Sequence, residues 1–399
     1  MRVTQTMMYT SGAVAMQSQQ QDLQKLQENT TTGKRISRPS DDPTGSFRDV
    51  LFSADLSGVQ SLQKTTDTAS QRLNLADTQV GQMFERLLDA KDLALQMGNS
   101  ETAGNPDILK AQGESAKAIY QDILKNVNTE TDGTPIFSGS RTRSPYDAQH
   151  LQTTSMTMRS NGKGTLAPAP TGIKASVVNG QSITDLPMSV KMSYQAATGE
   201  FKVDVNGVEQ PPPKQTGTSP TVLDLGNGLQ VSVDDAYKPA KGDVYYFEVI
   251  PQYQGGVADR PVKVLNGQTL PGNVTGKELL EGTGPIGRNV NVLGAIAALR
   301  GALLRADPDE IHAQVDRLQE AGAQVSDLQA VTGVRVTLID AVSKTLSTDS
   351  EALSTAKATN SEADVLGLIS ELTQKSQNMQ VLTATERQIL NTSLLDFIR

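Results

Sequence analysis

Apolar residues recur at heptad spacing through much of the first third of the chain. The series is Leu62, Thr66, Ala69, Leu73, Ala76, Val80, Met83, Leu87, Ala90, Ala94 and Met97, and ten of its eleven members are apolar. Because no proline falls between residues 44 and 105, we predict one helix from about Thr44 to Met97. A shorter helix is predicted from about Asp107 to Asn128, with Asn105 or Pro106 at its start. The residues expected in the core of the helical bundle are Leu62, Leu73, Val80, Met83 and Leu87.

The last third of the chain carries a second long helical pattern. Asp307-Pro308-Asp309-Glu310 reads as an N-cap, a proline in the first turn and a capping-box glutamate. No further proline follows, and a single helix from there to residue 399 would reach about 135 Å. We therefore predict a break in the Ser- and Thr-rich stretch between Asp349 and Thr359.

Weaker apolar stripes occupy both chain ends. They are mixed with many polar residues and contain few aromatic side chains, so they bury too little surface to fold as an isolated pair. We expect these stripes to pack against other subunits. Their residues are Met16, Leu23 and Leu26 near the N-terminus, and Leu368, Leu372, Met379, Leu382, Ile389, Leu390, Leu394 and Phe397 near the C-terminus.

The middle of the chain has the pattern of β-structure. Fourteen of the 18 prolines lie between Pro135 and Pro285, where they oppose long helices. Apolar and polar residues alternate from Met188 to Tyr194 and again from Phe201 to Val205, which predicts a hairpin. Further strands are predicted at residues 229–233 and 244–249, with exposed connections at 211–213 and 217–220.

Together these patterns predict an α+β fold in which a long antiparallel helical bundle or coiled coil, made from both chain ends, carries an inserted β-rich domain. The expected limits are 1–42 for an N-terminal helix that is partly disordered in the monomer, 43–138 and 289–350 for the two parts of a helical domain, 139–288 for the β-rich insertion, and 351–399 for a C-terminal helix. The two ends must meet, because only residues 309–399 supply a helix long enough to cover the N-terminal heptads.

Composition argues against several functions. The net charge is −8, with 36 Lys and Arg against 44 Asp and Glu, so no basic face for nucleic acid is expected. The chain has no cysteine and only His150 and His312, which leaves few ligands for a metal or residues for a catalytic base. No stretch approaches the roughly 20 apolar residues of a membrane span. A secretory signal is not evident at the start, which by itself predicts a cytoplasmic protein.

Two short motifs carry a weak chemical pattern. Gly282-Thr-Gly284-Pro-Ile-Gly287 fits G-x-G-x-x-G, but the residues before it look helical and no βαβ unit surrounds it, so we interpret it as an interdomain turn. Asp234-Asp235 is interpreted as a solvated strand end, because neighbouring residues on a strand point to opposite faces. We expect no cofactor, no metal and no catalytic residues.

The segment from Thr31 to Gly45 has a more specific pattern. Gly33 suits the position after a helix, Pro39 holds Arg38 extended, and Ser40 or Asp42 can cap a new helix whose first residue is Pro43. Arg35 and Arg38 are expected to pair with Asp41 and Asp42. The residues that define this turn are Gly33, Lys34, Arg35, Ile36, Pro39, Ser40, Asp41, Asp42 and Pro43.

This turn resembles the N-terminal signature of the flagellin superfamily, and its Ser-Asp-Asp-Pro ending is more similar to hook-associated members than to flagellin. Residues 228–249 resemble the middle domain of hook-associated proteins. Residues 291–299, Gly333-Val-Arg335 and 390–399 resemble the returning helix, the long C-terminal helix and the apolar C-terminus of the family. The similarity covers about 250 residues, and it departs from the family around residues 145–185 and 211–213.

The resemblance implies a structural, non-enzymatic role in the bacterial flagellum. The expected protein is an extracellular ring of subunits at the hook-filament junction, between hook-associated protein 1 and the first flagellin subunits, with the terminal helices in the inner tube. Type III export without a cleaved signal, and a cytoplasmic chaperone on the C-terminal helix, are also implied. This reverses the cytoplasmic prediction. The alternatives are flagellin itself, an enzyme within the middle domain, which would need an absent H-E-x-x-H motif, and an adhesin.

Overall fold

The structure, a computed structural model, describes residues 5–99, 105–160, 166–178, 185–216, 220–226, 228–264, 267–282 and 288–397. Long helices from both chain ends and a strand-rich middle confirm the predicted α+β class. The chain forms two compact units. The first contains Met1–Lys64 and Ser343–Arg399, and the second contains Thr65–Val342.

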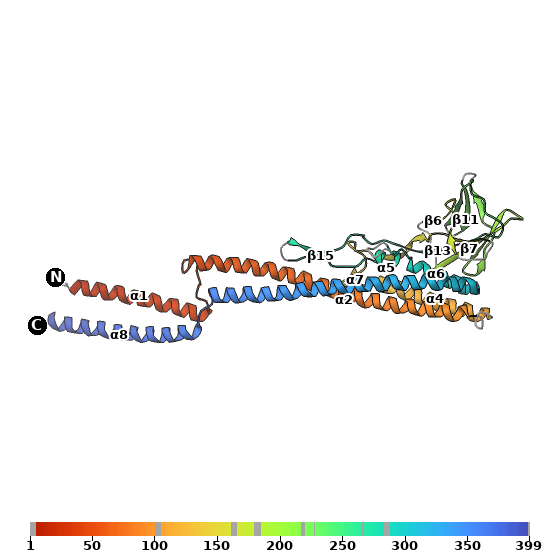
Figure 1. Ribbon diagram of the computed structural model, residues 1–399. Coiled ribbons are helices and arrows are strands. Elements are labelled where there is room, and N and C mark those ends of the chain that lie inside the picture. Colours follow the sequence, from red (N-terminus) through yellow and green to blue (C-terminus); the bar gives the residue numbers. More distant parts are fainter. Residues whose placement is uncertain are drawn as a thin grey trace. The chain divides into compact units, whose positions relative to one another are not determined.

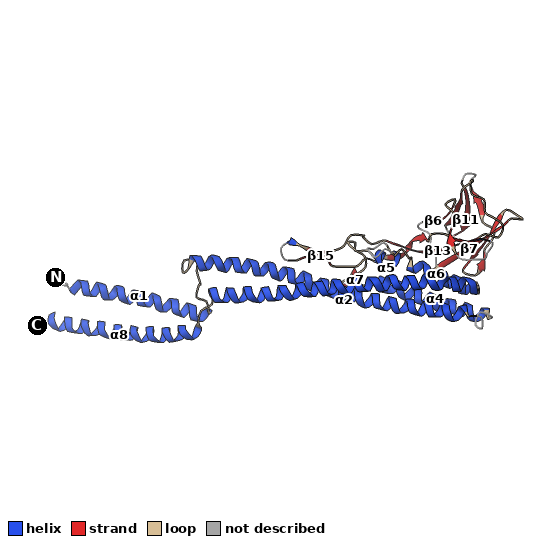
Figure 2. Cartoon of the chain, viewed as in Figure 1, coloured by secondary structure: helices blue, strands red, loops and turns tan. Residues whose placement is uncertain are grey.

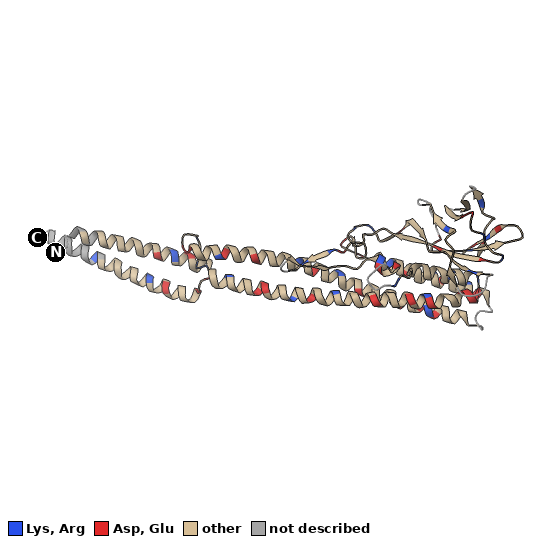
Figure 3. Ribbon diagram, turned by 45° about the horizontal axis from the view of Figure 1, so that its top comes forward, with Lys and Arg blue, Asp and Glu red and all other residues tan. Residues whose placement is uncertain are grey.

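The helices α1 (Gln5–Thr32) and α8 (Val365–Phe397) lie side by side in the first unit. Figure 1 shows them as neighbouring helices that carry the two chain ends. An ion pair joins them, with 2.8 Å between Lys375 Nζ and Asp22 Oδ2. Charged residues are sparse on both helices (Figure 3), so their pairing depends mainly on apolar contacts.

The two longest helices are α2 (Pro43–Gly98) and α7 (Pro308–Ser361). The bounds of α2 agree with the predicted helix from Thr44 to Met97. Four of the five expected core residues are fully buried and Leu62 is half-buried. The buried four are Leu73, Val80, Met83 and Leu87.

Two details of α7 correct the prediction. The helix continues through residues 349–359 and ends at Ser361, because hydroxyl groups that favour loops elsewhere donate to carbonyl groups four residues earlier. Thr359 donates to Thr355 O at 2.9 Å, and Ser361 donates to Lys357 O at 2.9 Å. At the other end the backbone of Glu310 donates to Asp307 Oδ1, but its carboxylate pairs with Arg305 rather than completing a capping box.

In the second unit, α2 and α7 share an apolar core with α4 (Pro106–Val127), α5 (Gly276–Glu281) and α6 (Val292–Leu304). Asn105 caps α4 by accepting from the backbone of Asp107 at 3.1 Å, as the sequence predicts. Every residue of α6 from Val292 to Leu303 is buried. This helix packs on α4 and also contacts two strands, so it lies between a helical layer and a sheet.

The strands of the second unit form two main sheets, which Figure 2 shows gathered beside α6. The larger sheet has the order β5-β4-β13-β7-β8-β9, with β3 also paired to β13, and the smaller has the order β10-β11-β12-β6. The bounds in the larger sheet are β3 (Tyr146–Thr153), β4 (Thr157–Arg159), β5 (Ala167–Pro168), β7 (Met188–Gln195), β8 (Glu200–Val205), β9 (Val208–Glu209) and β13 (Val244–Tyr253). Those in the smaller are β6 (Ile173–Val177), β10 (Lys214–Thr216), β11 (Thr221–Gly226) and β12 (Leu229–Val233). Short pairs are formed by β1 (Glu130–Thr131) with β2 (Thr134–Pro135) and by β14 (Pro261–Lys263) with β15 (Thr269–Pro271).

The predicted hairpin is present as β7 and β8, with Tyr194 opposite Phe201. Strand β13 is buried on both faces from Val244 to Pro251 because it separates two layers. Its residues Tyr245, Phe247 and Val249 belong to the core between the sheets. On the opposite face Ile250 belongs to the helical core, so alternate side chains of one strand join the insertion to the helices.

Candidate functional site

The turn between α1 and α2 joins the four helical segments of the first unit. Gly33 ends α1 with a φ of +67°, a conformation that costs little only for glycine, and its N–H donates to Asn29 O at 2.8 Å. The chain then runs antiparallel to the break between α7 and α8, where Lys34 forms a bridge with Glu362.

Two backbone hydrogen bonds hold this bridge. Arg35 N donates to Ser361 O at 2.8 Å, and Ala363 N donates to Gly33 O at 3.0 Å. The chain therefore changes direction at two places far apart in the sequence, and each change is held by the other.

Side chains of Arg35 and Asn360 strengthen the junction. The guanidinium of Arg35 donates to Asn360 O at 2.8 Å and to Asp42 Oδ2 at 3.3 Å. Asn360 Nδ2 in turn donates to Gly45 O at 2.8 Å. The first turn of α2, the turn before it and the last residues of α7 are thus connected by one set of hydrogen bonds.

Asp42 is the N-cap of α2, and Pro43 is its first residue. Asp42 Oδ1 accepts from Gly45 N at 2.9 Å, and this bond, helped by Arg35, lowers the pKa of the carboxyl group below its usual range. A Cβ on residue 45 would lie 2.4 Å from Asp42 Oδ2 and 2.5 Å from Ile36 Cδ1, so a larger residue would displace the ends of these two side chains. Ser40, the other predicted cap, is exposed.

Asp41 has a different set of partners. It accepts from Arg38 N at 3.0 Å, and it pairs with Lys25 of α1 at 3.0 Å. The hydrogen bond from Lys25 is the main cause of a lowered pKa for this carboxyl group. The guanidinium of Arg38 lies 3.6 Å from Glu28 rather than on Asp41 or Asp42, so only part of the expected pairing is present.

The predicted packing residues of α8 whose side chains are described are all half-buried. The half-buried Leu372 and Met379 share a face with Lys375, which is paired to α1, so this face of α8 is turned toward α1. Their packing against other subunits stays a prediction. The predicted packing residues that are buried or half-buried are Met16, Leu23 and Leu26 on α1, and Leu368, Leu372, Met379 and Leu382 on α8. The remaining predicted residues, Ile389, Leu390, Leu394 and Phe397, lie outside the described side chains.

A second set of apolar residues in the first unit is exposed, and the sequence analysis missed it. On α8 these are Leu366, Ile369 and Val381, of which Leu366 is 79% exposed. On α1 and α2 they are Met7, Val14, Phe47, Val50 and Leu51, with Phe47 65% exposed. Met7 and Val14 are seven residues apart, Phe47 lies three and four residues before Val50 and Leu51, and Leu366 lies three residues before Ile369, so helical spacing was the available pattern for these residues. Groups of exposed apolar residues of this kind are typical of interaction surfaces.

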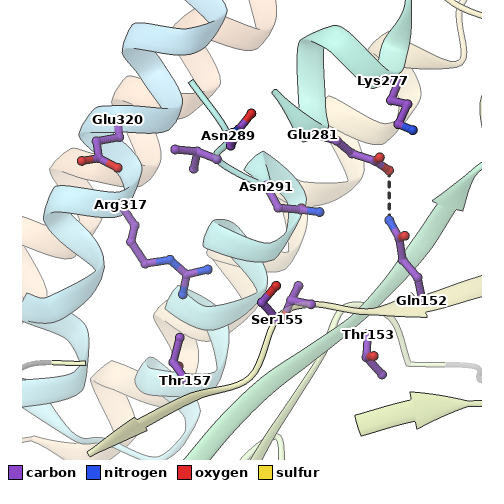
Figure 4. Close-up of a pocket in the computed structure, with 12 residues that line it drawn as sticks. Gln152, Thr153, Ser155, Thr157, Lys277, Glu281, Asn289, Asn291, Arg317 and Glu320 are labelled. Atoms are coloured by element: carbon purple, nitrogen blue, oxygen red, sulfur yellow. Dashed lines mark hydrogen bonds between the residues drawn. The ribbon is translucent and has the colours of Figure 1, made fainter. Parts of the chain in front are cut away.

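The second unit contains a pocket of about 560 Å³ between the loop after β3, α5 and α7 (Figure 4). Gln152 donates to Glu281 across its wall at 3.0 Å. Its charged side chains are Lys277 and Arg317 against Glu281 and Glu320, so the charges balance and favour neither an anion nor a cation. We assign no ligand to it.

The other sequence motifs do not bring their side chains together into a site. Gly282 ends α5 in a left-handed conformation, so a helix and not a strand precedes G-x-G-x-x-G, and residues 283–287 lie outside the described chain. Asp234 and Asp235 are exposed. His150 pairs with Asp147, and His312 is exposed. Within the described ranges no group of three or more His, Asp or Glu residues is placed to hold a metal.

None of the helices in the described part of the chain combines the length and apolar content that a membrane crossing requires.

Comparison with known proteins shows which proteins this chain resembles. Residues 3–142 match the bacterial flagellin N-terminal helical region. The chain is 28% identical over 150 residues to flagellar hook-associated protein 3 of Salmonella typhimurium. The aligned stretch covers 37% of this chain and 46% of that protein. The chain is 26% identical over 144 residues to the Escherichia coli protein of the same name, and that alignment covers 36% and 44%. The chain thus spans about half the length of these curated relatives.

Among solved structures, the chain is similar to that of a putative flagellar hook-associated protein from Vibrio parahaemolyticus. The two are 15% identical, the alignment covers 80% of this chain and 99% of that chain, and they superpose with a TM-score of 0.49.

Proposed function

We propose that this chain, which is related to flagellar hook-associated protein 3 and begins with a flagellin N-terminal helical region, is a structural subunit of the bacterial flagellum at the hook-filament junction. In this role copies of the chain form a ring that joins hook-associated protein 1 to the first flagellin subunits. The protein acts through packing surfaces and not as an enzyme.

The observation that supports this proposal most directly is the construction of the first unit. The turn that carries the family resemblance is bonded to the break between α7 and α8, so α1 and α8 are positioned together. Both helices, and the start of α2, keep apolar residues exposed. A subunit that completes its core by assembly would have these properties.

The route to the flagellum belongs to the same proposal. The protein is exported through the flagellar type III pathway without a cleaved signal and is finally extracellular. A cytoplasmic export chaperone would cover the exposed residues of α8 before export, because apolar helix faces that remain open at cytoplasmic concentrations favour aggregation.

Electron microscopy of cells that lack this protein tests the proposal. We expect hooks without filaments and flagellin released into the medium, with normal filaments restored when the gene is supplied again. Normal filaments in the deletion strain would refute a junction role.

Flagellin is the alternative within the family, and abundance separates the two roles. A filament subunit would be the dominant protein of sheared flagella, whereas a junction protein would be a trace component. Similarity to hook-associated protein 3 favours the junction role.

A further inference from the structure

Helix α6 carries two buried arginines that the proposed function does not use. Arg300 is 3% exposed within an otherwise apolar helix, and Arg305, at the C-terminal end of the same helix, is 5% exposed. Arginine is seldom buried to this degree unless its guanidinium is paired. Their partners show what the two side chains do.

Arg300 holds the chain just before β7. Its Nη1 donates to Pro187 O at 2.6 Å, and its Nη2 lies 3.2 Å from Asp185. Glu114 of α4 lies 3.3 Å from the same nitrogen, and Lys117 of α4 contacts Asp185 at 2.7 Å. The segment entering the sheet is thus tied to two helices by charged groups.

Arg305 contacts three strands. Its Nη2 donates to Ser189 Oγ of β7 at 3.2 Å, and its Nη1 lies 3.6 Å from Asp204 of β8. The guanidinium also lies 5.9 Å from the ring centre of Tyr246 on β13. An ion pair with Glu310, itself 3% exposed, fixes Arg305 to the first turn of α7.

Between the two arginines the backbones of helix and sheet approach closely. A Cβ on Gly301 would lie 2.3 Å from Ser189 Oγ and 2.4 Å from its Cβ. A Cβ on Gly207, in the turn between β8 and β9, would lie 2.6 Å from Leu304 O. Glycine on both sides lets the hairpin lie against the end of α6.

We propose that residues 300–305 of α6 form a latch that holds the inserted sheet in one orientation on the helices. Apolar contact at β13 favours burial but is not directional. Charge-assisted hydrogen bonds from Arg300 and Arg305 to residues 185–189 are directional, and they act at two points five residues apart. The ion pair between Arg305 and Asp204 adds a contact to β8. The latch therefore fixes the orientation of the sheet, while the apolar core supplies its adhesion.

Paired spin labels measure that orientation directly. The chain has no cysteine, so Gln96→Cys on α2 and Glu200→Cys at the tip of the hairpin, both exposed, provide unique attachment sites in the full chain. Electron spin resonance then gives the distribution of label separations. We expect one narrow distribution in the parent protein.

Three changes release the latch in different ways. Gly301→Ala inserts a methyl group where Ser189 lies, and Arg305→Met with Glu310→Leu replaces a buried ion pair by apolar groups. Ser189→Ala with Asp204→Asn removes only the groups on the sheet. Each is expected to broaden or shift the distribution, while hydrogen exchange in β11 and β12 stays slow because the sheets remain folded.

Matched controls keep the test specific. Gly322→Ala on α7 places its methyl group 3.9 Å from Phe84, and Arg288→Met breaks an exposed pair with Asp327, so both are expected to keep the narrow distribution. Unchanged distributions in the folded latch variants would overturn the proposal. If Gly301→Ala or the Arg305 variant fails to fold, the Ser189 and Asp204 variant decides, since it leaves the helical side intact.

Discussion

Single residues in the turn before α2 have conformational and capping roles that can be recognised from the neighbouring sequence. Gly33 has a left-handed conformation, a Cβ on residue 45 would displace the side chains of Asp42 and Ile36, and Asp42 caps the first turn of α2. Sequence reasoning predicted the roles of Gly33 and Pro43 because helix ends depend on neighbouring residues. The sequence did not decide between Ser40 and Asp42 as the N-cap of α2, because either side chain can accept a hydrogen bond from the first turn of the helix.

Gly33→Ala is expected to destabilise the first unit by about 1 kcal/mol, because residue 33 has a left-handed φ that a Cβ disfavours. Gly58→Ala is the matched control, in the interior of α2, and is expected to stabilise by up to about 1 kcal/mol through helix propensity. Neither new methyl group would meet another atom within 4 Å, so contacts do not explain the difference. Urea unfolding followed by circular dichroism gives both values, and equal effects would contradict the role assigned to Gly33.

At the scale of helices and strands, local periodicity predicted α2, α4 and the β7–β8 hairpin closely. It misplaced the break before α8, because the hydroxyl groups of residues 349–359 are satisfied within the helix. The partner of the turn, residues 360–363, was not predicted, since a backbone bridge to residues 33–35 leaves no local pattern. Arg300 and Arg305 were missed for a related reason: the partners that join them to the sheet segment, Pro187 and Ser189, lie 113 and 116 residues away in the sequence.

The two faces of α8 make separate predictions. Leu372→Ser with Met379→Ser removes apolar groups that face α1, so the helicity of the isolated protein should fall. Leu366→Ser with Val381→Ser changes the exposed face and should leave that helicity unchanged while filament assembly in cells fails. Circular dichroism and filament counts measure these outcomes. The assignment of faces is wrong if both pairs lower helicity equally.

At the scale of the whole molecule, the division into two units predicts that the second unit stays folded when part of the first is removed. The second unit has its own helical core and sheet core within Thr65–Val342. Neither core needs residues from α8.

Deleting residues 365–399 should therefore leave the second unit folded and monomeric but abolish junction assembly. Limited proteolysis and calorimetry of the shortened protein, compared with the full chain, measure the first outcome. Electron microscopy of cells that produce only the shortened protein measures the second. Normal filaments in those cells would contradict the need for α8.

The pairing of α1 with α8 also sets an order of events during synthesis. Asp22 and Lys375 are 353 residues apart, so at 5–20 residues per second α1 leaves the ribosome about 20–70 s before its partner helix exists. For that interval the apolar stripe of α1 has no intramolecular partner, and all of the second unit is synthesised before α8. The pairing of α1 with α8 therefore forms only after the second unit has been synthesised.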